Sequence, residues 1–129
     1  MLSINYLFDL AEVVNKSKEI LELKTDWDGC GAKKIKSNTW YFAKSFIINT
    51  YHEINNHKEN KFPIPSIRPC NDGSIDIYWG SDEFSLIVNI KSNNTLFFHF
   101  QLSDDRNNMK GNFINTNCQN LGFINLILL

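Results

Sequence analysis

Asp26-Trp27-Asp28-Gly29-Cys30-Gly31-Ala32 joins two helical sequence patterns, and it places two carboxylates, an indole and two glycines within seven residues. The Asp28-Gly29 pair favours a tight turn, and Gly31 permits a second residue with positive φ or a close backbone approach. Trp27 is large enough to fill a core beneath the turn. We therefore expect a structural joint made of Asp26, Trp27, Asp28, Gly29 and Gly31.

The segments on both sides of this joint have the apolar spacing of amphipathic helices. The first runs from about residue 2 to residue 23, with most charged side chains opposite its apolar stripe. That stripe consists of Leu7, Leu10, Val14 and Leu21. The second runs from about residue 38 to residue 56, with Ser37 as a natural N-cap, and Pro63 prevents its continuation.

After Pro65 the hydrophobic period changes from helical to alternating. Ser66 to Pro69 fits a short edge strand, and Asn71-Asp72-Gly73 is a strong turn signal. Three clear strands follow, and a weaker one from Met109 to Ile114 contains Gly111. The alternate residues of the clear strands, which we expect to face the core, are Ile75, Ile77, Trp79, Phe84, Leu86, Val88, Ile90, Leu96, Phe98, Phe100 and Leu102.

These patterns predict an α+β fold, with two N-terminal helices packed on a three- to five-stranded antiparallel meander sheet. The helical half covers about residues 1–60 and the sheet half about residues 64–129. Each half is too small to bury a core alone, so we expect a single domain over residues 1–129. A hydrophobic fraction of 43%, with ten Phe and three Trp, supplies that core.

Charge and cysteine usage narrow the class of protein. Thirteen basic and fourteen acidic residues give a formal charge of -1, so no overall field attracts nucleic acid or an anionic membrane. Three widely spaced cysteines, Cys30, Cys70 and Cys118, form no C-x-x-C pair, which favours reduced thiols over disulfides or structural zinc. The apolar run Leu121 to Leu129 is too short to span a bilayer. We therefore expect a cytoplasmic protein without membrane contact.

Several carboxylates raise the question of a metal site. Asp26, Asp28, Asp72 and Asp76 could together bind a divalent cation, which would favour a metal-dependent enzyme acting on a phosphate-containing substrate. Asp26, Asp28 and Asp72 also have a sufficient role in turn geometry, and that structural interpretation is the stronger one. We therefore expect no catalytic residue, metal or cofactor.

Nucleotide or nucleic-acid binding is a further alternative. The run Lys33-Lys34-Ile35-Lys36 could contact phosphate, although a short basic run beside a turn is usually a solvated loop. Gly29-Cys30-Gly31 matches neither of the common glycine-rich phosphate loops. Nucleic acid is therefore disfavoured as a partner.

The strands carry apolar residues on the face that is otherwise polar. Tyr78, Ile87 and Phe97 form a strip on that face, and His99 lies beside Phe97 on the same strand face. The surrounding residues are Ser, Asp, Asn and Thr, so contact with protein explains exposed aromatics better than contact with nucleic acid does. The hypothesis is a non-enzymatic interaction protein that binds and masks a protein partner, or self-associates, through this strip.

The order of motifs over roughly residues 20–90 resembles a family of small uncharacterised bacterial and phage proteins. The family has a W-D-G-x-G-A signature and a later P-x-x-D-G-x-I element. Here these are Trp27-Asp28-Gly29-Cys30-Gly31-Ala32 and Pro69-Cys70-Asn71-Asp72-Gly73-Ser74-Ile75. No catalytic residue or cofactor is carried over from this resemblance. The mobile or defence-related loci that hold such proteins imply an inhibitor, an antitoxin or an immunity-type protein.

Overall fold

The computed structural model describes residues 4–55, 62–102 and 108–113, with only the backbone described for residues 55 and 108–113. The predicted loop at residues 56–61, the terminal apolar run Leu121 to Leu129 and Cys118 lie outside these residues. None of the described helices has both the length and the hydropathy needed to cross a bilayer.

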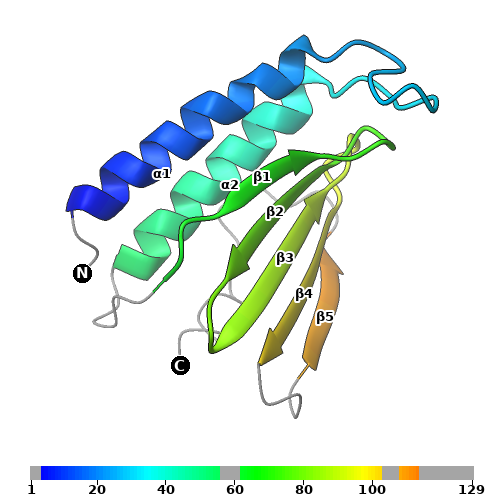
Figure 1. The fold of residues 1–129 in the computed structure, drawn as a ribbon. Coiled ribbons are helices and arrows are strands. Elements are labelled where there is room, and N and C mark those ends of the chain that lie inside the picture. Colours follow the sequence, from blue (N-terminus) through cyan, green and yellow to red (C-terminus); the bar gives the residue numbers. More distant parts are fainter. Residues whose placement is uncertain (1–3, 56–61, 103–107, 114–129) are drawn as a thin grey trace.

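Two helices pack side by side on one face of an antiparallel sheet (Figure 1), which confirms the predicted α+β fold. The helical layer consists of α1 (Ile4–Ser17), the 3₁₀ helix η1 (Lys18–Glu22) and α2 (Ser37–Asn55). The strands are β1 (Ser66–Pro69), β2 (Ile75–Gly80), β3 (Phe84–Ile90), β4 (Leu96–Leu102) and β5 (Asn108–Phe113). Their order in the sheet is their order in the chain, so the sheet is a meander.

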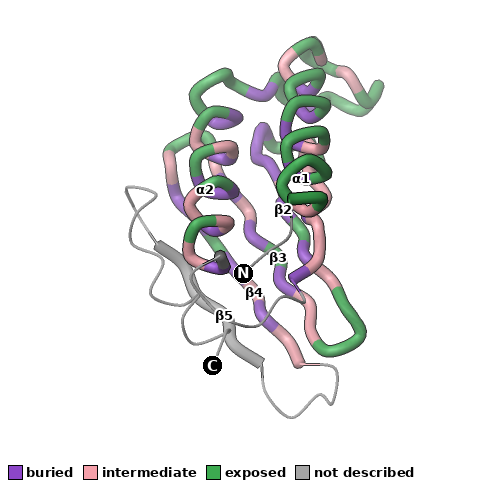
Figure 2. Tube along the Cα trace, turned by 90° about the vertical axis from the view of Figure 1, so that its left-hand side faces the viewer, coloured by how far each residue is buried: buried purple, intermediate pink, exposed green. Residues whose placement is uncertain are grey.

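One hydrophobic cluster fills the space between the helices and the sheet, where buried residues concentrate (Figure 2). Ile77, Val88 and Phe98 lie opposite one another on β2, β3 and β4, and all three are buried. The ring of the buried Trp79 lies 6.2 Å from the ring of Phe46 on α2. The alternation predicted for β2, β3 and β4 therefore corresponds to the core face of the sheet.

The first helix differs from its prediction in both length and burial. Its α-helical part ends at Ser17, where the Ser17 hydroxyl donates to the Val14 carbonyl at 2.6 Å and accepts from the Trp40 indole at 2.9 Å. The buried α1 residues are Leu10, Val14 and Ser17, whereas Leu7 remains 42% exposed. Leu7 belongs to the apolar stripe but stays exposed, because the stripe of α1 is wider than the surface that the helix packs against.

The start of α2 also differs from the prediction. The backbone N–H groups of Thr39 and Trp40 both donate to the Lys36 carbonyl, at 3.1 and 3.2 Å. Ser37 is already helical, so Lys36 takes the N-cap position and the helix begins one residue earlier than predicted. Two buried hydroxyl oxygens on this helix, those of Thr39 and Thr50, have no hydrogen-bond partner among the described residues.

Candidate functional site

The sheet face turned away from the helices carries a continuous apolar strip. Tyr78 on β2 lies opposite Ile87 on β3, and Ile87 lies opposite His99 on β4. Phe97 is two residues from His99 on the same face, which makes it the diagonal neighbour of Ile87. Tyr78, Ile87 and Phe97 are 42%, 40% and 41% exposed, and His99 is half-buried. The four residues proposed from the sequence are therefore neighbours, and we call them the strip.

Gly80 gives the Tyr78 ring its position. A Cβ placed on residue 80 would overlap the Tyr78 ring, with its hydroxyl oxygen nearest. The ring thus extends along β2 and covers the backbone at residue 80. Because the φ angle of Gly80 is not in the left-handed region, the glycine is needed for space and not for backbone conformation.

A hollow of about 350 Å³ adjoins the strip at the β1 edge of the sheet. Tyr78 and Ile87 line it together with Ser66, Arg68 and Asp76. Arg68 is exposed, and it has no ion-pair partner within the described residues although it lies opposite Asp76 in the strand register. The hollow therefore combines an apolar wall with an available guanidinium group.

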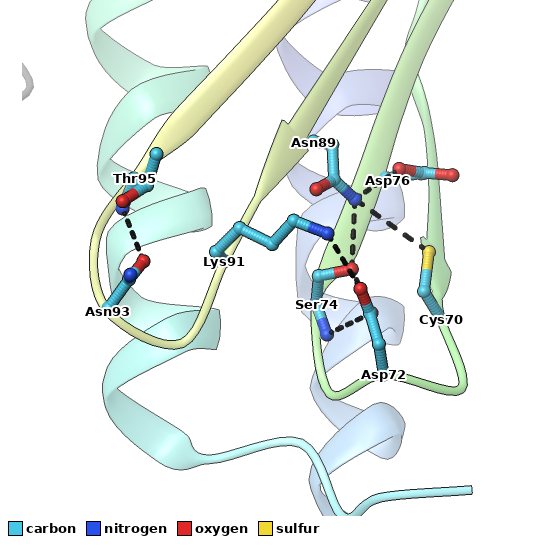
Figure 3. A network of polar contacts seen from close by, with 8 residues as sticks. All are labelled: Cys70, Asp72, Ser74, Asp76, Asn89, Lys91, Asn93 and Thr95. Carbon is cyan, nitrogen blue, oxygen red and sulfur yellow. Dashed lines mark hydrogen bonds and ion pairs between the residues drawn. The ribbon is translucent and has the colours of Figure 1, made fainter. Parts of the chain in front are cut away.

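The Asp76 carboxylate is instead held by a polar network that borders the strip (Figure 3). The Asn89 amide donates to Asp76 at 2.7 Å and to the Ser74 hydroxyl at 2.9 Å, and its nitrogen lies 4.0 Å from the Cys70 sulfur. Burial is the main cause that raises the pKa of Cys70 to about 11. At neutral pH the thiol is therefore protonated and is a poor nucleophile.

Asp72 and Lys91 connect this network to the strip. The Lys91 ammonium lies 2.7 Å from the Asp72 carboxylate and 5.9 Å from the centroid of the Phe97 ring. The Ser74 backbone N–H also donates to Asp72, at 3.0 Å. The hydrogen bond from Lys91 and those from Ser74 lower the pKa of Asp72 to about 2. Asp72 is thus charged at neutral pH, and it holds Lys91 over the edge of Phe97.

The joint between the helices uses its carboxylates to bind its own backbone. Asp28 accepts the N–H groups of Cys30 and Ala32, at 2.8 and 3.0 Å, and Asp26 accepts that of Gly31 at 2.6 Å. The Cys30 hydrogen bond is the main cause that lowers the pKa of Asp28. Gly29 and Gly31 have φ angles of 73° and 86°, and Asp26 itself has a φ of 65°.

Trp27 does not fill the core as the sequence analysis expected. Its indole N–H donates to the Lys33 carbonyl at 3.1 Å, and the ring is half-buried outside the hydrophobic cluster. The reason is that the loop projects past the ends of α1 and α2 (Figure 1). Lys34 is also used locally, because its ammonium caps the carbonyls of Leu21 and Leu23 at 2.8 and 3.1 Å.

The structure does not gather the candidate metal ligands. In the part of the chain that it describes, no group of three or more His, Cys, Asp or Glu side chains is placed to hold a metal ion. Cys30 is exposed and Cys70 is half-buried, and neither forms a disulfide.

Sequence reasoning located the strip but missed two features around it. The sequence does contain a signal for the space that Gly80 leaves to the Tyr78 ring. Gly80 follows Tyr78 by two residues, and this spacing places both on one face of a strand. The Asn89 network depends on the register between β2 and β3, and no local signal marks that register. A scan against protein-family models, a search of curated proteins and a search of solved structures each found no match for this chain.

Proposed function

We propose that this chain is a small non-enzymatic interaction protein that binds and masks a protein partner through the outer face of its sheet. The observation that carries the proposal is the strip, in which three large apolar side chains are each about 40% exposed, with Tyr78 paired to Ile87 and Phe97 diagonal to Ile87. A contiguous apolar patch on a free face gains hydrophobic free energy when a partner covers it. Aromatic side chains such as Tyr78 and Phe97 also commonly dominate binding energy at interfaces.

The hollow beside the strip indicates the chemistry of that partner. Arg68 supplies a guanidinium group without an ion-pair partner among the described residues, next to the apolar surface of Tyr78 and Ile87. Guanidinium groups bind carboxylates through two parallel hydrogen bonds. The expected partner segment therefore places apolar side chains on the strip and an Asp or Glu carboxylate in the hollow.

Masking by this face fits an inhibitor, an antitoxin or an immunity-type protein of a bacterial or phage defence-related locus. Such a protein acts by occupying a surface that its partner needs, and it requires no catalytic group of its own. The resemblance to the W-D-G-x-G-A family supports the same role. Self-association through the strip is the competing outcome of the test below.

The test compares tagged wild-type protein with a Tyr78→Asp, Phe97→Asp double variant as baits in extracts of the native host. Tyr41→Asp is the matched control, because Tyr41 is a 50% exposed aromatic on α2. We expect the wild type and the control to retain one stoichiometric protein that the double variant loses. In titration calorimetry with that purified protein, Arg68→Glu should weaken binding roughly tenfold or more.

Circular dichroism of the double variant, read together with the retained proteins, separates three outcomes that would contradict the proposal. If the double variant is unfolded, the strip is ordinary core and the proposal is wrong. If the double variant is folded and still retains the same protein, binding takes place elsewhere on the surface. If the only protein that the double variant loses is the chain itself, the strip serves self-association.

A further inference from the structure

The helical layer has an apolar groove of its own. A hollow of about 510 Å³ lies between α1 and α2, with Leu7, Ala11 and Val14 on one wall and Ile48 and Tyr51 on the other. Two large apolar side chains of α1 next to it are the most exposed in the described part of the chain, with Ile4 at 68% and Phe8 at 67%. This apolar surface lies on the helical layer, whereas the strip lies on the sheet face that is turned away from the helices.

The spacing of the wall residues suits another helix. Ile4, Leu7, Ala11 and Val14 are separated by three, four and three residues, which is the spacing of the apolar seam in a coiled coil. On α2, the groove residues Lys44, Ile48 and Tyr51 are separated by four and three residues. A helix laid along the groove would therefore meet a row of side chains on each side.

The charges around the groove favour a helix that carries a carboxylate. The polar residues that line it are Asn15, Lys44 and His52, and no acidic residue is among them. The Lys44 ammonium lies 5.5 Å from the centroid of the Trp40 ring, and it has no ion-pair partner within the described residues. An occupant with a carboxylate beside its apolar side chains would supply that partner.

The chain's own α1 has this composition. Ile4, Phe8 and Ala11 form an exposed stripe at helical spacing, and Glu12 follows on the flank of α1 that points away from α2. Contacts from Trp40 to Ser17 and from Tyr51 to Tyr6 set α1 and α2 antiparallel, so Lys44 lies close to the level of Val13. Glu12 of a second copy, with its helices parallel to those of the first, would reach that level.

We infer that two copies of this chain pair through their helical layers, with α1 of each copy in the α1/α2 groove of the other and Glu12 facing Lys44 of the other copy. The dimer has two-fold symmetry: each copy inserts its α1 into the groove of the other copy and receives the other copy's α1 in its own groove. It leaves both strips on the outside of the dimer, so it does not depend on the proposed function.

Sedimentation equilibrium of the full chain over a range of concentrations tests the inference. We expect a dimer for the wild type, and a dissociation constant raised roughly 100-fold or more by Phe8→Glu, because the carboxylate would be buried in the groove. Lys16→Gln is the matched control, since it changes the net charge by the same amount at an exposed α1 position outside this groove. A wild type that stays monomeric, or a folded Phe8→Glu variant that still dimerises, overturns the inference.

Charge exchange tests the predicted pair directly. Glu12→Lys and Lys44→Glu should each weaken the dimer roughly tenfold, because like charges then face each other. A mixture of the two variants should form a heterodimer of near wild-type affinity, since both of its contacts join opposite charges. Failure of the mixture to recover overturns the assignment of Lys44 as the partner of Glu12. If the Phe8→Glu variant still retains the protein partner proposed for the strip, the strip and the helical groove act independently.

Discussion

The Tyr78 ring occupies the space that a side chain on Gly80 would need. Gly80→Ala should therefore turn the ring away from the sheet and lower the affinity for the proposed partner roughly tenfold. Only the end of one side chain has to move, so we expect the free energy of unfolding to fall by less than about 1 kcal/mol. Chemical denaturation and calorimetry measure the two effects.

The control for this prediction is Gly80→Ala in a protein that lacks the Tyr78 ring. In a Tyr78→Ala background, Gly80→Ala should have no further effect on affinity, because the two changes act through one contact. Equal losses in both backgrounds would mean that residue 80 contacts the partner itself and that the ring position is unimportant.

The pair formed by Asp72 and Lys91 predicts a dependence of stability on pH. The pKa of Asp72 is about 2 in the folded protein, below the ordinary value of 3.8. Between pH 2 and pH 3.8 the unfolded chain therefore binds more protons than the folded chain. The contribution of Asp72 to stability is therefore complete above about pH 4 and is lost as the pH falls toward 2. Because both side chains are more than one third exposed, we expect less than about 1 kcal/mol.

Urea unfolding of the wild type and of Asp72→Asn at several pH values between 6 and about 2 measures this contribution. The asparagine keeps an oxygen that accepts the Ser74 N–H, so the comparison isolates the charge. The difference in unfolding free energy between the two proteins should shrink toward acid pH. A difference that stays constant down to pH 2 would contradict the assignment of this shift to Asp72.

The buried Thr50 hydroxyl gives a prediction of the opposite sign. Its oxygen has no hydrogen-bond partner in the part of the chain that the structure describes, and the residue is 0% exposed. Thr50→Val replaces the hydroxyl by a methyl group of similar size, so it should stabilise the protein by about 1 kcal/mol. Thermal unfolding, with Thr25→Val in the exposed loop as a control, measures the change. A destabilised Thr50→Val would indicate that the hydroxyl is hydrogen-bonded in solution.

The elements that sequence analysis predicted best are those in which local signals agree. Ile75 and Ile77 alternate with polar residues after the Asp72-Gly73 turn, so the strand, its start and its core face all follow from a few neighbouring residues. Ser66–Pro69 was found as an edge strand because Pro69 and its turn limit its length.

The features that were missed depend on contacts between distant segments. Leu7 has the same helical periodicity as Leu10, and only the packing of α1 on the sheet decides which of them is buried. In the same way, α1 ends at Ser17, whose hydroxyl accepts a hydrogen bond from the indole N–H of Trp40, 23 residues away in the sequence. The strip could be named from strand alternation, but the groove between α1 and α2 required the relative position of two helices.

The joint between the helices provides a test of the metal-dependent alternative. Asp26 and Asp28 already accept backbone N–H groups from Gly31, Cys30 and Ala32, so those oxygens hold the loop in shape. An Asp26→Asn, Asp28→Asn double variant keeps an oxygen acceptor at both positions and removes both charges. We expect this variant to bind the sheet partner like the wild type, and we expect Mg²⁺ and Mn²⁺ to leave the melting temperature of both proteins unchanged. A rise in melting temperature with either ion in the wild type, absent from the variant, would instead make the joint a cation site.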